Sequence, residues 1–406
     1  MGLADSFLRW NCRWESEQGE WQMWFQLHPW VLPIIIGSIG LLYLINNIAA
    51  IISSRKMQRE GIDHHISGIP FLGGIHLLIA GLISPIKWLG FLSLLDYSFW
   101  SFLYALLIGD RFRKDVTVDY DNQQIKEYSY LQDGFEAVLY DAGNDDDRLI
   151  IVIQGLKGLE LPKMYAYLFS ERGYSTLAMS YYGGKGQKKG MRAIPLEQFQ
   201  AACDEMKKCG YKRIGIYGNS KGGGMALLAA SVVPDISLVI AASAFGHIMQ
   251  GTGRVSEDPC KAMVSYRGND FPYIEKGKLM SDFLKRCIRE RNIRLLYFFD
   301  EWDKKGTEEN EIPVENIHGD ILLLTATHDE SVPAKRDAEL LCKRLERKQF
   351  KHNYRHINSE IGSHNLGYFP VNNDVLRREK IYPEECQRAR EETLNIIIET
   401  LEAWKV

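Results

Sequence analysis

The sequence lacks any pair of cysteines at the spacing of a metal site or a disulfide framework. Its seven cysteines are odd in number, scattered and without a C-x-x-C pair, which disfavours both bound zinc and disulfide cross-links. We therefore expect idle, unpaired thiols, no metal and a reducing compartment. The cysteines are Cys12, Cys203, Cys209, Cys260, Cys287, Cys342 and Cys386.

A strong excess of charge of either sign is also missing. The chain carries 49 basic and 52 acidic residues, a net charge of −3, in 406 residues, so we expect no nucleic-acid partner. The hydrophobic share of 46% is that of an ordinary globular protein. A chain of this length has room for one large domain of about 250–300 residues and a smaller appendage.

The chain lacks the basic start, followed by a short apolar core near residue 10, that a signal peptide would need. Its first thirty residues are polar and rich in tryptophan, and we expect no cleavage there. Trp10, Trp14, Trp21 and Trp24 recur at helical spacing, which predicts an amphipathic helix in the membrane interface over residues 1–30. A helix that packs against a partner would show the same pattern.

Long apolar runs are confined to residues 31–110. Val31–Ile52 has 22 residues without a charge, enough to cross the ~30 Å hydrocarbon layer as a helix. Ile69–Ile86 and Trp88–Ile108, the latter with Asp96 as its only charge, predict a helical hairpin of two further spans. We therefore expect a multi-pass membrane anchor of about three transmembrane helices.

Basic clusters beside these runs predict an orientation. Arg55, Lys56 and Arg59 follow the first run, and Arg111–Lys114 follows the third. In a three-span arrangement both clusters lie on one side, which the positive-inside rule assigns to the cytoplasm. The large C-terminal part would then be cytoplasmic. If Ile69–Ile86 does not cross, two spans remain, and an N-terminus outside would place the C-terminal part outside as well.

Beyond Asp115 the pattern changes to strands that alternate with helices, as in a parallel sheet covered on both faces. The predicted strands are Val116–Tyr120, Gln124–Tyr130, Phe135–Tyr140, Leu149–Ile153, Ser175–Ser180, Arg213–Tyr217, Leu238–Ala242, Ile321–Thr325 and Tyr354–Asn358. The predicted helices between them include Pro162–Arg172, Leu196–Lys208 and Ala226–Ser231.

A G-x-S-x-G pattern stands where one of these strands meets a helix. In Gly218-Asn-Ser-Lys-Gly222 the small residues permit the sharp turn that exposes a nucleophilic serine in the α/β-hydrolase fold. We expect this fold over residues 115–406, with Ser220 as nucleophile. The N–H groups of Lys221, and of Leu156 in the loop after an earlier strand, are the expected oxyanion hole. A glycine-rich turn without a catalytic role is the alternative.

A serine hydroxyl needs a base, and the base needs an acid that orients it. The chain order in this fold is serine, acid, histidine. Asp329 follows a predicted strand, with Glu330 as the fallback, and His364 lies in a loop. His356, within a strand, and His328, beside the acid, are expected to be structural, because a loop histidine can reach the serine.

Several segments resemble the family of acyl-CoA thioesterases and bile-acid-CoA:amino-acid N-acyltransferases. Lys221, directly after the nucleophile, is similar to that family's elbow, and similar segments extend over about residues 148–370. The resemblance implies a C-terminal α/β-hydrolase domain that acts on small acyl-CoA substrates. The other similar segments are Ile194–Glu197, Ser265–Gly268, Phe271–Tyr273, Ile312–Ile317 and His364–Pro370.

The chain departs from this family at two places. Apolar runs and a short strand-rich segment stand where the mammalian members carry a β-sandwich domain. The expected nucleophile is serine, whereas the conjugating members use cysteine. A serine ester favours hydrolysis by water over transfer to an amine, although an acyl-CoA-dependent acyltransferase stays an alternative.

The resemblance also implies contacts to the phosphates of coenzyme A as part of the substrate; no other cofactor is expected. Lys185, Lys188, Lys189 and Arg192 lie in a glycine-rich loop after a predicted strand, at the edge of the sheet where ligands bind. A solvated basic loop would look the same. Residues 246–311 are long for a connection and predict a cap over the acyl pocket.

Other functions remain open at this point. A serine esterase, lipase or peptidase would use the same triad with a different pocket. A non-catalytic membrane protein that kept the fold is disfavoured by the complete triad, and a channel or transporter by the single acid within the apolar runs. The sequence does not predict an oligomeric state.

Overall fold

The computed structural model describes residues 27–59, 71–96, 124–143, 146–252, 261–290, 294–367 and 376–404. The chain divides into two compact units, residues 1–115 with 289–293 and residues 116–288 with 294–406. Two predictions fall on residues outside the described ones: the interfacial helix, up to residue 26, and the strand Val116–Tyr120.

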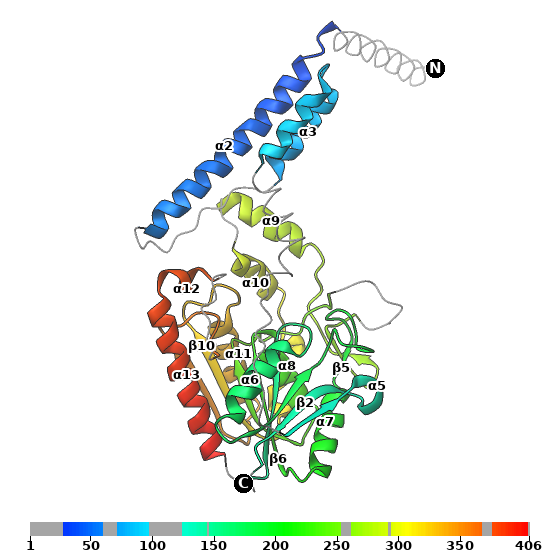
Figure 1. Cartoon of the computed structure of the whole chain (residues 1–406), viewed down its shortest axis with the longest axis vertical. Coiled ribbons are helices and arrows are strands. Elements are labelled where there is room, and N and C mark those ends of the chain that lie inside the picture. The colour runs from blue at the N-terminus through cyan, green and yellow to red at the C-terminus, as the bar shows by residue number, and fades with distance from the viewer. Residues whose placement is uncertain are drawn as a thin grey trace, which may run out of the picture. The chain divides into compact units, whose positions relative to one another are not determined.

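The first unit consists of helices in its described part. The long helix α2 (Val31–Arg59) has α3 (Leu72–Ile83) packed along it, and the 3-10 helix η1 (Lys87–Leu95) packs against α3 (Figure 1). The backbones of α3 and η1 lie close together at Gly81 and Gly90. A Cβ atom on Gly81 would lie only 2.0 Å from the Gly90 nitrogen. The small residues therefore permit backbone contact that a side chain would block.

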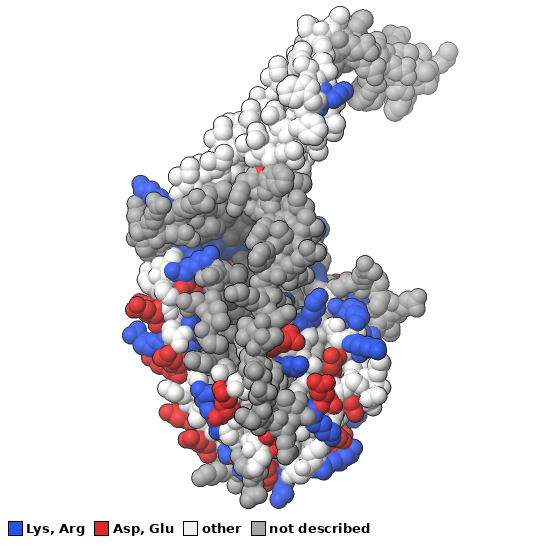
Figure 2. Space-filling model, viewed as in Figure 1, with Lys and Arg blue, Asp and Glu red and all other residues white. Residues whose placement is uncertain are grey.

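Among the described helices, α2 alone is long and apolar enough to cross a membrane. Its window Val31–Ala50 has a mean hydropathy of 1.9, and 11% of this window is buried. Figure 2 shows almost no charged side chain over α2 and α3 on the face drawn, whereas both signs are interspersed over the second unit. The apolar surface of α2 suits lipid better than water.

The three-span prediction is not supported. Where Ile69–Ile86 was expected to cross, α3 has 12 residues, about 18 Å of helix, which is too short for the ~30 Å hydrocarbon layer. Where Trp88–Ile108 was expected to cross, the first residues form the nine-residue helix η1, and residues 97–108 lie outside the described ones. The sequence predicted the tight turn near Pro85, Lys87 and Gly90, and the structure has a turn between Ile83 and Lys87. The prediction that the segments on its two sides are long enough to cross is the part that is not supported.

An eight-stranded sheet forms the centre of the second unit, in the order β1-β2-β4-β3-β6-β7-β10-β11. Only the pairs β1–β2 and β2–β4 are antiparallel. The strands are β1 (Gln124–Tyr128), β2 (Glu136–Asp141), β3 (Arg148–Gln154), β4 (Ser175–Ser180), β6 (Arg213–Asn219), β7 (Ile236–Ala242), β10 (Asp320–Ala326) and β11 (Tyr354–Ser359).

The predicted strands from Gln124 onward are confirmed, with their ends shifted by at most two residues. The central ones are apolar over most of their length because both faces of the sheet are covered. A small sheet escaped prediction, since its strands are only two or three residues long. It has the order β5-β8-β9, made of Ile194–Pro195, Val264–Tyr266 and Asn269–Asp270.

Helices cover both faces of the large sheet (Figure 1). One face packs against α6 (Glu160–Ser170) and α13 (Pro383–Ala403). The other packs against α7 (Glu197–Lys208), α8 (Lys221–Ala230) and α11 (Ala334–Arg347). The remaining described helices are α5 (Tyr130–Asp133), α9 (Leu279–Glu290), α10 (Leu295–Asp303), η2 (Glu308–Asn310), η3 (Val314–Asn316) and α12 (Arg377–Ile381).

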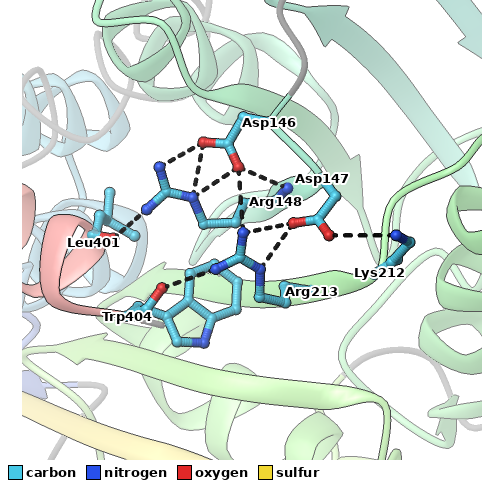
Figure 3. Close-up of polar contacts among 7 residues, drawn as sticks. All are labelled: Asp146, Asp147, Arg148, Lys212, Arg213, Leu401 and Trp404. Carbon is cyan, nitrogen blue, oxygen red and sulfur yellow. Dashed lines mark hydrogen bonds and ion pairs between the residues drawn. The ribbon is translucent and has the colours of Figure 1, made fainter. Parts of the chain in front are cut away.

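Charged side chains fasten the end of α13 to the amino ends of two central strands (Figure 3). Arg148 and Arg213 donate to the main-chain carbonyl oxygens of Leu401 and Trp404, at 2.6 and 3.3 Å. These carbonyls belong to the last turn of a helix, which lacks intrahelical donors. Both guanidinium groups are also paired with neighbouring carboxylates, those of Asp146 and Asp147. The loops that follow β6, β10 and β11 lie at the opposite end of the sheet.

Candidate active site

Ser220 occupies the turn between β6 and α8 in a backbone conformation that glycine usually adopts. Its φ is 59° and its ψ is −126°, which is strained for a residue with a side chain. The Ser220 N–H donates to the Ala242 carbonyl oxygen at 2.8 Å, and the Ser220 carbonyl oxygen accepts the Gly223 N–H at 2.9 Å. The neighbouring strand and the first turn of α8 therefore hold the strained turn in place.

The glycines around Ser220 leave no room for a side chain, because Gly218 and Gly222 lie against backbone and Gly224 lies against an aromatic ring. A Cβ atom on Gly218 would lie 2.2 Å from the Gly222 carbonyl oxygen, and one on Gly222 would lie 2.9 Å from Gln154 Cα. A Cβ atom on Gly224 would meet the Phe245 ring at 2.3 Å. The elbow therefore needs small residues at Gly218 and Gly222, as the G-x-S-x-G pattern predicted.

Ser220, His364 and Asp329 form one hydrogen-bonded row. His364 Nε2 lies 2.9 Å from Ser220 Oγ, and His364 Nδ1 lies 2.8 Å from Asp329 Oδ2. Asp329 Oδ1 accepts the N–H groups of Ser331 and Val332, at 2.8 and 3.0 Å. The Asp329 side chain is 3% exposed and that of His364 is 15% exposed. Three loops at the carboxyl ends of β6, β10 and β11 thus bring together the three residues predicted as a triad.

The His364 loop is held by residues that sequence reasoning missed. Ser243, at the end of β7, donates through its Oγ to the His364 carbonyl oxygen at 2.9 Å. The neighbouring Ser363 donates to Glu379 Oε1 at 2.6 Å, and Arg390 Nη1 lies 3.1 Å from Glu379 Oε2. Glu379 and Arg390 are buried. Ser243 could have been found as a polar residue directly after a strand, but nothing local marks Glu379 or Arg390.

The other candidate acid and histidines lie in different environments. Glu330 Oε2 accepts the N–H groups of Arg377 and Arg378 at the start of α12, at 3.1 and 3.3 Å. His356 Nε2 lies 2.7 Å from the Thr325 hydroxyl in the adjacent strand, and burial lowers the pKa of the His356 imidazole. The structure therefore brings His364, rather than His356, to Ser220, and Asp329, rather than Glu330, to His364.

The predicted oxyanion donors lie in adjoining segments. Lys221 is the first residue of α8, and a Cβ atom on Gly155, in the turn after β3, would lie 3.2 Å from the Lys221 nitrogen. Leu156 directly follows this glycine, and the Tyr182 hydroxyl donates to the Gly155 carbonyl oxygen at 3.3 Å. The use of the Lys221 and Leu156 N–H groups as an oxyanion hole stays a prediction.

The four basic residues proposed for phosphate binding follow β4, whose carboxyl end lies at the same edge of the sheet as Ser220. Lys189 Nζ donates to the Gly184 carbonyl oxygen at 2.9 Å. Lys185 is exposed and lines a pocket of about 360 Å³ together with residues of α5. A phosphate contact by Lys185, Lys188, Lys189 or Arg192 stays a prediction.

A pocket of about 520 Å³ lies beside Asp329, the acid of the candidate triad. Its lining includes Leu296 and Tyr297 of α10 together with Asp329 and Val332. Both α9 and α10 lie beyond the carboxyl edge of the sheet (Figure 1), within the segment 246–311 that was predicted to form a cap. Aromatic contacts join the two helices, with the Phe283 and Phe298 rings 6.0 Å apart.

A second buried acid lies near the triad. Asp337, in the first turn of α11, is 4% exposed and accepts the Gly246 N–H at 3.0 Å. Burial, together with the nearby carboxylates of Asp303 and Asp329, raises the pKa of Asp337 to about 7. This carboxyl group therefore changes its charge near neutral pH.

The mostly parallel sheet, the helices on both faces and the serine elbow define the α/β-hydrolase fold, which confirms the predicted fold class. Residues 194–381 match the family described as BAAT / acyl-CoA thioester hydrolase C terminal. The family resemblance deduced from the elbow and the surrounding segments is thereby confirmed over this part of the chain, which holds the whole candidate triad. A comparison with curated proteins gave no match.

Solved structures with similar folds include several hydrolases. The chain has 16% identity and a TM-score of 0.38 to an esterase of Pyrococcus furiosus, over 68% of this chain and 90% of that one. It has 12% identity and a TM-score of 0.39 to an acylaminoacyl peptidase of Pyrococcus horikoshii, over 68% of this chain and 40% of that one. It has 13% identity and a TM-score of 0.41 to a puromycin-hydrolyzing peptidase of Mycobacterium tuberculosis, over 67% of this chain and 38% of that one. Likenesses of this strength say nothing about the substrate.

Proposed function

We propose that the chain is a serine hydrolase that cleaves acyl thioesters such as acyl-CoA, or related acyl esters, through an acyl-enzyme on Ser220. The observation that carries this proposal is the hydrogen-bonded row of Ser220, His364 and Asp329 at a strained elbow. A thioester substrate is supported by the family match over residues 194–381. A neutral carbonyl substrate needs a nucleophile, a base and an oxyanion hole, and the chain has candidates for all three.

The first half of the reaction forms the acyl-enzyme. His364 donates Nδ1–H to Asp329, so its Nε2 is the acceptor that lies 2.9 Å from Ser220 Oγ. Nε2 takes the hydroxyl proton as Oγ attacks the acyl carbon, and the buried Asp329 carboxylate stabilises the imidazolium that results. The carbon–sulfur bond then breaks, His364 returns the proton to the leaving thiolate, and Ser220 is left as an ester.

The second half releases the acid. The N–H groups of Lys221 and Leu156 would hold the negative oxygen of each tetrahedral intermediate, with the N-terminus of α8 adding to the favourable field. Water gives a proton to His364 and attacks the ester carbonyl, and His364 then protonates Ser220 Oγ as the acid departs. Serine favours this hydrolytic step over transfer to an amine.

The test is hydrolysis by the purified full chain and its Ser220→Ala variant, measured on a panel of acyl-CoA thioesters and simple esters. We expect the variant to lose more than about a thousandfold in kcat/KM, because the covalent route is gone. Its unfolding midpoint should stay unchanged, and a fluorophosphonate should label the parent alone. Retained activity would show that Ser220 is not the nucleophile. Turnover of esters without turnover of any acyl-CoA would favour the esterase or peptidase alternative.

We also propose that α2 anchors the protein in a membrane, with the second unit in the cytoplasm. Support comes from the apolar, little-buried window Val31–Ala50 and from Arg55, Lys56 and Arg59, which follow it. A reporter fused after Val406 tests the orientation, because protease added to intact cells should leave a cytoplasmic reporter intact. The N-terminal sequence of the mature protein tests whether α2 is retained. Digestion of the reporter in intact cells, or removal of α2 from the mature protein, would reject this proposal.

A further inference from the structure

The helix α9 has an apolar face wider than the part that the second unit covers. Leu279 and Cys287 are buried, and Phe283 contacts the Phe298 ring of α10. These three residues follow one another at the four-residue spacing of a single helix face. The core below them includes Trp302. This row packs α9 against α10 and the small core beneath it.

A second apolar row runs beside the first and is exposed. Met280, Leu284 and Ile288 also follow the four-residue spacing, and they are 57%, 51% and 61% exposed. Each lies one position after a residue of the attached row, so the two rows together cover about half of the helix circumference. Three large apolar side chains in line on one exposed helix are more than the scattered hydrophobic residues of an ordinary surface.

Basic side chains border the exposed row. Lys285 and Arg289 are both 73% exposed, and they lie next to the row on the side away from the cap. From Lys278 to Glu290 the chain has four basic and two acidic residues. One of the basic residues, Arg286, pairs with Asp300 and Glu301 of α10 at 2.9 and 3.4 Å, so an excess of one positive charge remains among the other five. The acids pair locally, Asp282 with Lys285 at 3.7 Å and Glu290 with Arg289 at 3.1 Å.

We propose that α9 lies in the interface of a lipid bilayer, with Met280, Leu284 and Ile288 among the acyl chains and the basic residues at anionic headgroups. An apolar row bordered by lysine and arginine is the pattern of an in-plane membrane helix. The bilayer is favoured as occupant because α2 would tether the second unit to it, which gives the weak surface a high effective concentration. The inference rests on the proposed membrane anchoring by α2.

This docking has a consequence for the substrate. The attached row of α9 contacts α10 through Phe283 and Phe298, and Tyr297 of α10 lines the same pocket as the triad residue Asp329. A helix that is held at the membrane is therefore only one packing layer from the pocket beside the triad. The acyl chain of a substrate dissolved in the bilayer would enter through this cap rather than through water.

The experiment uses the full chain in nanodiscs of phosphatidylcholine with phosphatidylglycerol, in which a fraction of the lipid carries a photoreactive group on its acyl chain. Cross-linked peptides are mapped after irradiation. We expect label on residues 279–290 as well as on α2. Leu284→Glu should lower the α9 label about tenfold, because a charge is excluded from the acyl region, and should leave the α2 label unchanged. Leu131→Glu, at another leucine that is 63% exposed, is the matched control and should change neither.

The outcomes separate this inference from the proposals on which it rests. Label on α2 without label on α9 would overturn the docking and leave the anchor, as would an α9 label that Leu284→Glu does not lower. Absence of label on α2 would overturn the anchor and the docking together. Omitting phosphatidylglycerol should lower the α9 label roughly fivefold for each basic residue in contact; no change would overturn the role of the basic residues. Turnover of a water-soluble ester should be equal in parent and Leu284→Glu.

Discussion

Two histidines of this chain show how the surroundings of a residue decide its chemistry. His356 and His364 both make a short hydrogen bond to a hydroxyl group, at 2.7 and 2.9 Å. The hydroxyl near His356 belongs to Thr325 inside the sheet, where burial lowers the pKa of the imidazole. The hydroxyl near His364 belongs to Ser220 at the elbow, and the other nitrogen of His364 has a carboxylate as partner. Only the second arrangement can move a proton to and from a substrate.

We predict that His364→Ala lowers kcat/KM by more than about a thousandfold, because the serine loses its base. His356→Ala should lower kcat/KM by less than about threefold and should cost about 1 kcal/mol of unfolding free energy for the lost hydrogen bond. Ester hydrolysis and urea denaturation of both variants check this. If His356→Ala were the inactive variant, the assignment of the base would be wrong.

Asp337 gives a prediction for pH dependence. Its pKa is raised to about 7 in the folded protein and is about 3.9 in an unfolded chain. Between these two pKa values the folded state holds a proton that the unfolded state releases, and this proton stabilises the folded state. The contribution of Asp337 to the unfolding free energy is therefore complete below about pH 4 and is lost as the pH rises through about 7. Asp337→Asn stays neutral throughout. We expect its stability relative to the parent to increase from about pH 5 to about pH 8, in urea unfolding; an unchanged difference would contradict the raised pKa.

The helices α12 and α13 support the loop that carries His364 of the candidate triad. Glu379 of α12 accepts from Ser363, the neighbour of His364, and pairs with Arg390 of α13, which has 0% side-chain exposure. A buried ion pair adds little net stability when complete, but removing one partner leaves a charge in a medium of low dielectric constant. The pair therefore fixes where the His364 loop rests.

We predict that Glu379→Gln costs about 3–5 kcal/mol of unfolding free energy, because it removes the carboxylate that faces a buried guanidinium group. The matched control is Glu392→Gln, which breaks the pair of Glu392 with Arg388 on the surface of α13. That pair spans 4.0 Å, with side chains 59% and 62% exposed, and its loss should cost less than about 0.5 kcal/mol. Equal effects in denaturant titrations would show that the buried pair has no special role.

At the scale of the whole molecule, the chain joins a helical unit to a larger α/β unit with its own hydrophobic core. The two main core clusters of the α/β unit draw only on residues between Tyr128 and Trp404. The ties between α13 and the central strands also lie within this unit (Figure 3). A unit that buries its own apolar surface can fold alone.

We predict that removing residues 1–110 yields a soluble protein that hydrolyses short, water-soluble esters at a rate within about threefold of the full chain, since no triad residue is removed. The truncated protein should no longer sediment with membranes. Circular dichroism, ester turnover and vesicle sedimentation check these three points. Aggregation or loss of the thermal transition would mean that the helical unit completes the core of the second unit.

Much of the α/β unit could be predicted from sequence because its signals are local. Buried parallel strands have apolar runs such as Leu149–Ile153, and the elbow needs glycines that cannot be replaced by larger residues. The same reasoning failed for the helical unit. Ile69–Ile86 is apolar enough to suggest a span, but the length of a helix depends on where its backbone turns, and α3 ends at Ile83.

The order of Ser220, Asp329 and His364 along the chain was enough to predict that these residues meet, because each follows a strand at the same edge of a parallel sheet. Their hydrogen-bonded row agrees with that prediction, and their catalytic roles stay a proposal. The tertiary structure alone decided what holds them. Ser243, Glu379 and Arg390 act from other elements, and the exposed row on α9 differs from the buried row only through what packs against it. Local sequence specifies the bonds a segment can make with itself; contacts between distant segments exist only once the chain has folded.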